Sequence, residues 1–197
     1  MNNLLKGKNP YIFITAISLL VYVRSFFFKY TYFDDNVLIL DNLFFLKEIG
    51  NFFNAFTMEV FHVLHASAAY YRPMLTISFM MDAIFSGANP FLYHFTSVLI
   101  HIVNSCLVYL TLKKIKISND LSFILAAIFA VHPILIQGVS WLPGRNDSLL
   151  ALFILPAFIF FIDYFEKQTN KYLIFHFIFF ALALFTCRTY FLCIFGL

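Results

Sequence analysis

Two adjacent carboxylates, Asp34 and Asp35, are the residues of this sequence best suited to catalysis. A carboxylate can take the proton from an acceptor hydroxyl, and a like charge beside it raises the apparent pKa of such a pair. The alternative is an acidic loop that faces water or caps a helix, and this alternative is favoured for an arbitrary membrane protein. The pair is therefore a candidate general base that needs support from other residues.

Arginines supply the complementary positive charge. Arg72 follows Tyr70 and Tyr71, and a guanidinium can bind a phosphate group through two parallel hydrogen bonds. An aromatic anchor at the membrane interface, with an arginine that reaches toward the headgroups, is an equally open alternative. Arg145 and Asp147 lie just after a Pro-Gly turn. The alternative to a functional role for these two is a mutual ion pair, which the sequence favours.

Four polar residues share one face of an apolar segment: His94, Ser97, His101 and Asn104. Polar side chains inside a membrane face the bundle or a cavity and are functional candidates by default. For His101 and Asn104, hydrogen bonding between helices is the stronger alternative. His94 lies nearer the outer end of the segment and is the better candidate for a site.

No group in the sequence predicts a metal site, and the need for a divalent ion stays open. Glu59, His62 and His65 are spaced by three, so on a helix they diverge by about 60° at each step. The three cysteines are scattered through apolar runs without a Cys-x-x-Cys pair, which implies neither a disulfide nor a metal.

The composition predicts an all-α integral membrane protein. The chain is 62% hydrophobic and 12% charged, whereas soluble domains carry roughly 25% charged residues. A net charge of +3 is too small to indicate a nucleic-acid partner. A spanning helix needs about 20 apolar residues. About five spans and the start of a sixth are therefore predicted, at 11–28, 91–112, 121–139, 148–165, 172–185 and 189–197. His132-Pro133 predicts a kink in the third span.

The segment 30–90 is predicted to be a loop outside the membrane that carries two interfacial helices. Asp41 can cap the first, whose apolar residues up to Phe56 have near-helical spacing. The second begins at Pro73 and ends before Gly87, and its roughly 14 residues are too few to cross about 30 Å of hydrocarbon. If it does not cross, seven lysines share one side of the membrane, which is the positive-inside pattern: Lys6, Lys8, Lys113, Lys114, Lys116, Lys167 and Lys171.

Several short motifs occur in an order that resembles a known family. They are Tyr32-Phe33-Asp34-Asp35, Tyr71-Arg72-Pro73-Met74, Phe85-x-Gly87-x-Asn89-Pro90-x-x-x-His94, His101-x-x-Asn104, Phe129-Ala130-x-His132-Pro133 and Val139-x-Trp141-x-x-Gly144-Arg145-x-Asp147. This order resembles the N-terminal half of the membrane O-mannosyltransferases with tetratricopeptide repeats, and their bacterial relatives. These belong to the GT-C glycosyltransferases, which include the dolichyl-phosphate-mannose protein mannosyltransferases. The ordered set is fairly specific, although no single motif is.

The resemblance implies one GT-C helix bundle over 1–197, with the catalytic carboxylate in the first outer loop and a polyprenyl-phosphate-linked sugar as donor. It implies that Asp34 is the general base with Asp35 beside it, and that Arg72, His94 and Arg145 hold the donor phosphate. Supporting roles go to the remaining motif residues: His101, Asn104, His132, Trp141 and Asp147. The acceptor is expected to be a hydroxyl on protein, lipid or glycan. The expected location is the bacterial inner membrane or the ER membrane, with the site on the extracytoplasmic or luminal side.

Three departures from the family keep a second function open. Gln137 stands where relatives usually carry Glu, and Thr186-Cys187-Arg188-Thr189 replaces a Ser-Lys-Glu or Ser-Lys-Pro stretch. The further spans of the family do not follow. These departures predict a truncated chain that is inactive alone, and the alternative is a non-catalytic scaffold or degenerate relative. A transporter ranks last, because the polar groups gather at one surface and no repeat is visible.

Overall fold

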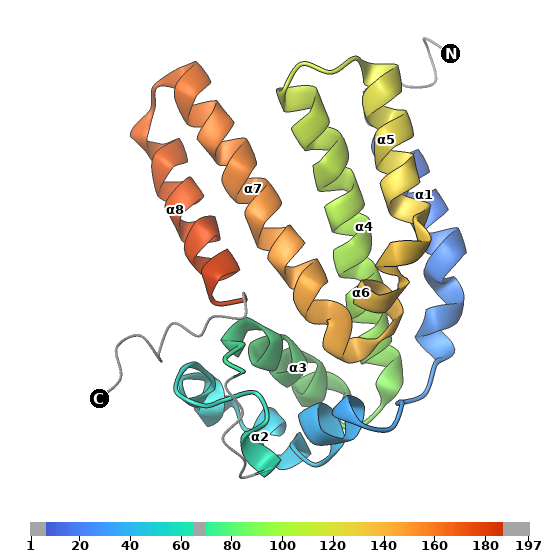
Figure 1. The fold of residues 1–197 in the computed structure, drawn as a ribbon, viewed down its shortest axis with the longest axis vertical. Coiled ribbons are helices and arrows are strands. Elements are labelled where there is room, and N and C mark those ends of the chain that lie inside the picture. Colours follow the sequence, from blue (N-terminus) through green and yellow to red (C-terminus); the bar gives the residue numbers. More distant parts are fainter. Residues whose placement is uncertain (1–6, 65–69, 187–197) are drawn as a thin grey trace.

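The computed structural model describes residues 7–64 and 70–186, which form helices and turns without a strand (Figure 1). This confirms the predicted all-α bundle. The long helices are α1 (Asn9–Tyr22), α4 (Pro90–Lys114), α5 (Asn119–Val131), α7 (Arg145–Lys167) and α8 (Asn170–Leu184). The helix α3 (Pro73–Ser86) lies across one end of them. Lys6, His65 and the predicted start of a sixth span at 189–197 lie outside the described residues.

Three helical stretches are long and apolar enough to cross a membrane: Asn9–Phe27, Pro90–Lys114 and Leu142–Lys167. A fourth is present if Asn119–Val131 and Pro133–Ser140, which are bent by 48°, count as one span. The predicted fifth span corresponds to α8, whose 15 residues extend only about 22 Å. By length, the described residues therefore hold three or four spans rather than five.

The bend confirms the predicted kink at His132-Pro133. Proline has no amide hydrogen and disfavours helical backbone at the preceding residue, so α5 ends and His132 adopts an extended conformation. The Nδ1 atom of His132 accepts a hydrogen bond from the Ile134 amide at 3.3 Å and starts the turn Pro133–Leu135. The short helix α6 (Ile136–Ser140) follows this turn. His132 therefore has an observed role as a cap on the bend.

The first interfacial helix was predicted wrongly as one continuous element. The structure breaks it into α2 (Leu43–Lys47) and two 3-10 turns, Ile49–Phe52 and Asn54–Phe56. Glu48 adopts an extended conformation that ends α2, and Asp41 does not cap this helix, which starts after Asn42. The second interfacial helix is confirmed as α3. Pro73 is its first residue, and Gly87 ends it with a φ of +60° that favours glycine.

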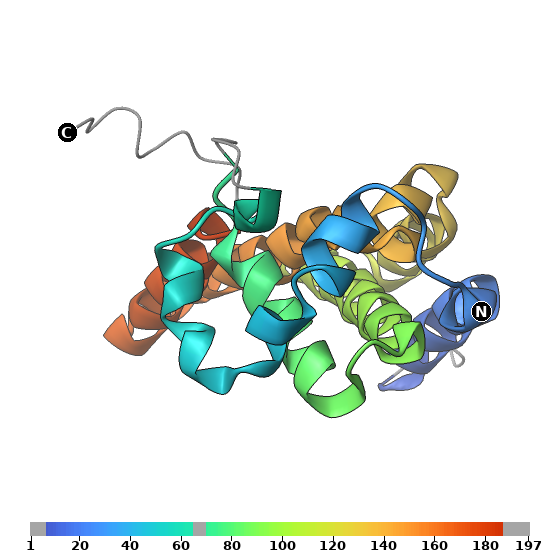
Figure 2. The same cartoon turned by 90° about the horizontal axis from the view of Figure 1, so that it is seen from below.

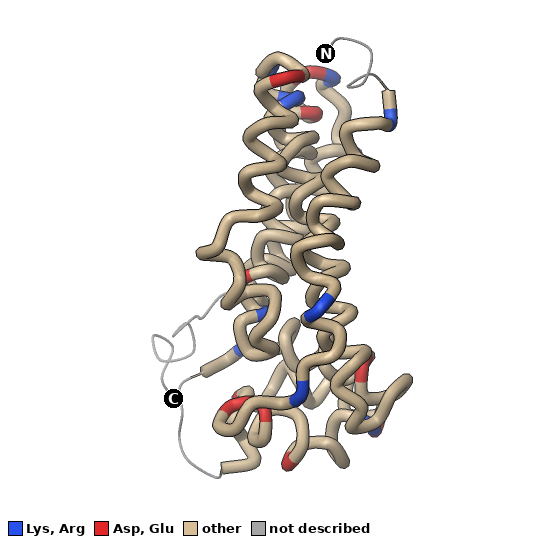
Figure 3. The backbone as a smooth tube through the Cα atoms, turned by 90° about the vertical axis from the view of Figure 1, so that its right-hand side faces the viewer, with Lys and Arg blue, Asp and Glu red and all other residues tan. Residues whose placement is uncertain are grey.

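The segment between α1 and α4 covers one end of the bundle, as the view along the helices shows (Figure 2). The turns that join α4 to α5 and α7 to α8 lie at the opposite end (Figure 1). The junction of α4 with α5 carries Lys113, Lys114 and Lys116, and the junction of α7 with α8 carries Lys167 and Lys171, whereas blue stretches of the tube, which mark lysine and arginine, occur at both ends of the bundle (Figure 3). Lys114 forms an ion pair with Asp163, and Lys167 lies 3.4 Å from the same carboxylate. The 30–90 loop and most lysines thus occupy opposite ends, as the non-crossing α3 requires.

This arrangement predicts the outcome of a labelling experiment. In a background without the native cysteines, we expect Tyr32→Cys and Lys116→Cys to react with a membrane-impermeant maleimide from opposite sides of sealed membrane vesicles of one orientation. The position that is protected in intact vesicles should react only after the membrane is permeabilised. Both positions are exposed, and the bundle separates them. Reaction of both positions from the same side would contradict the topology.

Candidate active site

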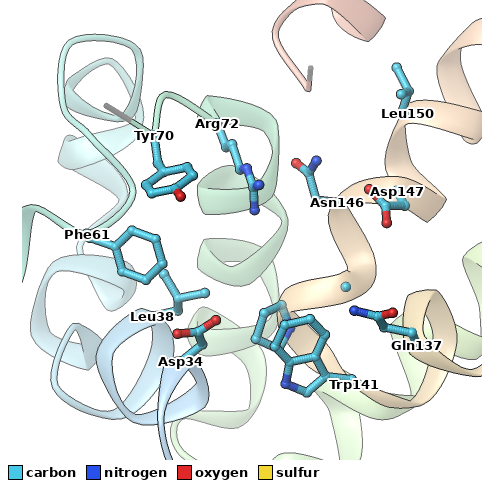
Figure 4. A pocket seen from close by; sticks show the side chains of 12 residues that line it. Asp34, Leu38, Phe61, Tyr70, Arg72, Gln137, Trp141, Asn146, Asp147 and Leu150 are labelled. Atoms are coloured by element: carbon cyan, nitrogen blue, oxygen red, sulfur yellow. The ribbon is translucent and has the colours of Figure 1, made fainter. Parts of the chain in front are cut away.

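A cavity of about 580 Å³ lies at the end of the bundle near α3 (Figure 4). Its lining comes from segments far apart in the sequence: Asp34, Leu38, Phe61, Tyr70, Arg72, Gln137, Trp141, Pro143, Gly144, Asn146, Asp147 and Leu150. Four of the predicted site residues, Asp34, Arg72, Trp141 and Asp147, therefore share one cavity. The fold brings the carboxylates of Asp34 and Asp147 and the guanidinium of Arg72, which belong to separate motifs of the sequence, into one cavity.

The two neighbouring aspartates have different environments. Asp35 is 1% exposed, and its Oδ2 accepts hydrogen bonds from the amide and the hydroxyl of Thr31 at 2.6 and 2.8 Å. Burial raises the pKa of Asp35, the hydrogen bonds from Thr31 lower it, and the nearby charge of Asp34 raises it further. Asp34 is partly exposed and lines the cavity. Asp35 therefore fixes the turn, and Asp34 is the carboxylate that can reach a ligand.

A strained residue precedes Asp34. Phe33 has a φ of +75°, which is unfavourable for a residue with a Cβ atom, and its side chain is 87% exposed. Its carbonyl oxygen accepts hydrogen bonds from the amides of Asn36 and Val37 at 3.1 and 3.4 Å. Such strain persists only where the surrounding structure enforces it, and it often marks functional sites. Here the strained turn directs the following residue, Asp34, to the cavity.

Arg72 brings positive charge to the cavity at the start of α3. Its side chain points into the cavity, and its Cζ atom lies 5.6 Å from the centre of the Tyr70 ring (Figure 4). The hydroxyl of Tyr71 donates a hydrogen bond to the Phe56 carbonyl at 2.8 Å, which ties this segment to the interfacial loop. Because Pro73 begins the helix, the arginine is held at the junction between the loop and α3.

The opposite wall depends on close packing between α6 and the start of α7. A Cβ atom on Gly144 would clash with the backbone of Gln137, so only glycine fits there. The hydroxyl of Ser148 donates to the Gly138 carbonyl at 2.7 Å, and the amide of Asn104 donates to the Ser148 carbonyl at 2.8 Å. Asn104 thus joins α4 to α7, and the wall holds Gln137 and the start of α7 side by side.

Arg145 does not line the cavity, although the resemblance implied a contact with the donor phosphate. Its side chain is fully buried, and its Nη1 atom lies 2.6 Å from the carboxylate of Asp82 in α3. Its other donors bind the Ser97 hydroxyl at 2.9 Å and the carbonyl of Tyr93. The ion pair with Asp147 that the sequence suggested does not form. Arg145 instead joins α7 to α3 and α4.

Asp82 is the partner that sequence reasoning missed. It is 3% exposed, and its second carboxylate oxygen accepts a hydrogen bond from the Thr96 hydroxyl at 2.7 Å. Burial raises the pKa of Asp82, whereas Arg145 and the hydrogen bond from Thr96 lower it. A carboxylate in the middle of a short apolar helix needs a paired cation if it is buried. That signal was present in the sequence, but it could not name the cation.

The three predicted histidines, His94, His101 and His132, lie in different parts of the structure. His132 caps the bend after α5, as described above. His94 is 2% exposed, packs against the ring of Phe28 and does not line the cavity. The Nε2 atom of His101 is hydrogen-bonded to the Ala130 carbonyl at 3.0 Å. His101 and Asn104 line a second cavity of about 340 Å³, which shares Gln137 and Asp147 with the first. Only the second cavity therefore has a histidine in its described lining.

The described residues contain no group of three or more His, Cys, Asp or Glu side chains that could hold a metal ion. The Nδ1 atom of His62 is hydrogen-bonded to the backbone carbonyl of Glu59. The imidazole of His62 and the carboxylate of Glu59 therefore do not form a shared metal site through this atom.

Comparison with known proteins identifies the family of this chain. Residues 72–197, which are 126 of the 197 residues, match the family described as dolichyl-phosphate-mannose-protein mannosyltransferase. The chain belongs to this family. It is similar to protein O-mannosyl-transferase tmtc2 of Xenopus laevis, with 33% identity over 74% of this chain and 18% of the relative. It is also similar to protein O-mannosyl-transferase TMTC1 of Mus musculus, with 37% identity over 45% of this chain and 10% of the relative.

The mannosyltransferase family is thus established for a chain that spans less than a fifth of the length of these relatives. The human protein O-mannosyl-transferase TMTC2 is 30% identical over 76% of this chain and 18% of its own length. No solved structure matches this chain. The described cavity combines residues from the family match, such as Arg72 and Asp147, with Asp34, which precedes that match.

Proposed function

We propose that this chain carries the catalytic cavity of a glycosyltransferase that moves mannose from a polyprenyl-phosphate carrier to a hydroxyl group. The observation that carries the proposal is the presence of Asp34 and Arg72 in one cavity at the end of an apolar helix bundle. The family membership and the names of the relatives, which are protein O-mannosyl-transferases, support it. Serine and threonine hydroxyls on a protein are therefore the first acceptors to test, before lipids and glycans.

In the proposed reaction, the acceptor hydroxyl oxygen attacks the anomeric carbon of the sugar and forms the new glycosidic bond. The bond between the anomeric carbon and the phosphate oxygen breaks, and the polyprenyl phosphate leaves with the bonding electron pair. Asp34 takes the acceptor proton, which makes the oxygen a stronger nucleophile. The guanidinium of Arg72 offsets the negative charge that develops on the phosphate.

The position of the cavity suits a donor that is dissolved in the membrane. Large aromatic side chains near Asp34 are strongly exposed, at 81% for Tyr32 and 75% for Phe27. Aromatic residues of this kind favour the headgroup region of a bilayer. The lysine-rich end of the bundle belongs on the cytoplasmic side by the positive-inside rule. The cavity between segment 30–90 and the start of α7 then opens on the extracytoplasmic or luminal side of a bacterial inner membrane or the ER membrane.

The remaining predicted residues have either a positioning role or a place in the cavity lining in this proposal. Arg145 positions the first turn of α7 through its ion pair with Asp82, rather than binding phosphate. His94 supports the packing of α4 against the segment before Asp34 through its contact with Phe28. Trp141 and Asp147 line the cavity and can contact the sugar.

Arg72 provides the direct test of donor binding. We expect Arg72→Ala to weaken the binding of farnesyl phosphate, a short analogue of the carrier, by about ten-fold or more, because a charged hydrogen bond contributes roughly 1.5–3 kcal/mol. Arg72→Lys should retain part of the affinity, because lysine keeps the charge but loses the planar fork. Binding can be followed by the fluorescence of Trp141, which is the one tryptophan of the chain and lines the cavity.

The matched control is Arg24→Ala, which removes an exposed arginine from the turn after α1. This change should leave the affinity for farnesyl phosphate within about two-fold of the wild type, because an exposed charge is well screened. Equal losses in the two variants would mean that general attraction to a charged surface explains the binding. Unchanged affinity in Arg72→Ala would remove Arg72 from the phosphate site.

A further inference from the structure

Asn146 is a buried amide in the cavity wall that was not among the candidate residues of the motifs. It is the second residue of α7 and is only 5% exposed. Its side chain lies between those of Arg72 and Asp147 in the view of the cavity (Figure 4). The position is well fixed, because the preceding Arg145 is held by Asp82 and Ser97.

The side-chain oxygen of Asn146 is buried and has no hydrogen-bond partner among the described residues. A buried acceptor without a donor destabilises a protein, and native structures leave few such atoms without a reason. An acceptor on a cavity wall can be satisfied when a ligand supplies a donor. The amide is therefore placed to receive a hydrogen bond from a molecule in the cavity.

The other polar groups of the cavity indicate which part of a ligand supplies this donor. Asp34 and Asp147 add carboxylate oxygens, which accept hydrogen bonds when they are ionised, and Arg72 supplies the guanidinium. A phosphate diester has no hydrogen to donate and has one strong partner in Arg72. A hexose carries several hydroxyl groups, each of which can donate. The acceptor-rich wall around Asn146 therefore suits the sugar rather than the phosphate.

We propose that Asn146 binds a hydroxyl group of the transferred sugar and contributes to the choice of that sugar. This inference rests on the proposed function, because it takes a glycosyl phosphate as the ligand. A site with a buried polar group discriminates strongly against a ligand that lacks the matching hydroxyl, since the group is then left without a partner. Asn146 thus distinguishes sugars by the presence of one hydroxyl.

The test compares two probes, farnesyl-phosphate mannose and farnesyl phosphate, which share the lipid and the phosphate; the second lacks the sugar and is a phosphate monoester rather than a diester. Their binding to the full chain is measured by the fluorescence of Trp141. We expect Asn146→Ala to weaken the binding of farnesyl-phosphate mannose by about ten-fold, and to leave farnesyl phosphate within about two-fold of the wild type. Retained binding of farnesyl phosphate also shows that the variant is folded.

Asn42→Ala is the matched control. Asn42 is 3% exposed and also has a buried side-chain oxygen without a partner among the described residues, but it does not line the cavity. The variant Asn42→Ala should leave the ratio of the affinities for the two probes unchanged. A series of mannosyl phosphates that each lack one hydroxyl should contain one member whose affinity is lowered in the wild type but not lowered further in Asn146→Ala.

The outcomes separate the inference from the function beneath it. If the wild type binds both probes and Asn146→Ala weakens both equally, Asn146 does not bind the sugar, whereas the proposed function stands. The same conclusion follows if Asn42→Ala changes the ratio as much as Asn146→Ala does. If the wild type binds neither probe, the proposed function fails and the inference fails with it.

Discussion

Replacing Asp34 with asparagine is expected to lower mannosyl transfer by about 10²–10⁴-fold, which is the usual contribution of a positioned general base. Asparagine has nearly the same shape but cannot take a proton from the acceptor hydroxyl. The affinity for farnesyl-phosphate mannose should change little, because Arg72 and the sugar contacts remain. The measurement is transfer of radiolabelled mannose from this donor to a peptide that contains serine and threonine.

The control for this result is Asp41→Asn, which removes an exposed carboxylate from the same segment outside the cavity. Its transfer rate should stay near that of the wild type. Transfer that survived in Asp34→Asn would remove Asp34 as the base. If the wild type binds the donor but never transfers the sugar, the alternative of a non-catalytic relative gains support instead.

The second large effect concerns the buried ion pair. Arg145→Met is expected to destabilise the protein by about 3–5 kcal/mol, because it leaves the carboxylate of Asp82 buried without its cation. Thermal unfolding in detergent measures this loss. The double variant Asp82→Leu with Arg145→Met should recover much of the stability, because it removes both buried charges. Recovery in the double variant would show that the loss in Arg145→Met comes from the unpaired charge of Asp82.

Lys167→Met serves as the control for the loss of an ion pair. Its side chain is 47% exposed and lies 3.4 Å from Asp163. Exposed pairs contribute little to stability, so the melting temperature should change little. Arg145→Met could instead melt like the wild type and yet lose farnesyl phosphate. In that case the arginine would contact the donor directly, as the resemblance implied, and the positioning role would be wrong.

The sequence determined those features of the fold that depend on neighbouring residues. Pro73 and Gly87 fixed the ends of α3, because proline starts a helix and glycine accepts the positive φ that ends it. His132-Pro133 fixed the bend after α5 for a similar local reason. Asp34 and Arg72 emerged from the order of the motifs as candidates for one site, and that pairing persists in the cavity.

Only the tertiary structure decided how the individual polar groups are used. Residue type alone does not separate Asp34 from Asp35, whereas in the structure Asp35 is buried and accepts hydrogen bonds from Thr31, and Asp34 lines the cavity. Arg145 found its partner 63 residues away in α3, and a separation of that kind leaves no local pattern. Asn146 lies buried in a cavity wall shared with Arg72 only because α7 packs there. Local sequence sets where helices begin and bend, whereas burial and pairing depend on which distant helices meet.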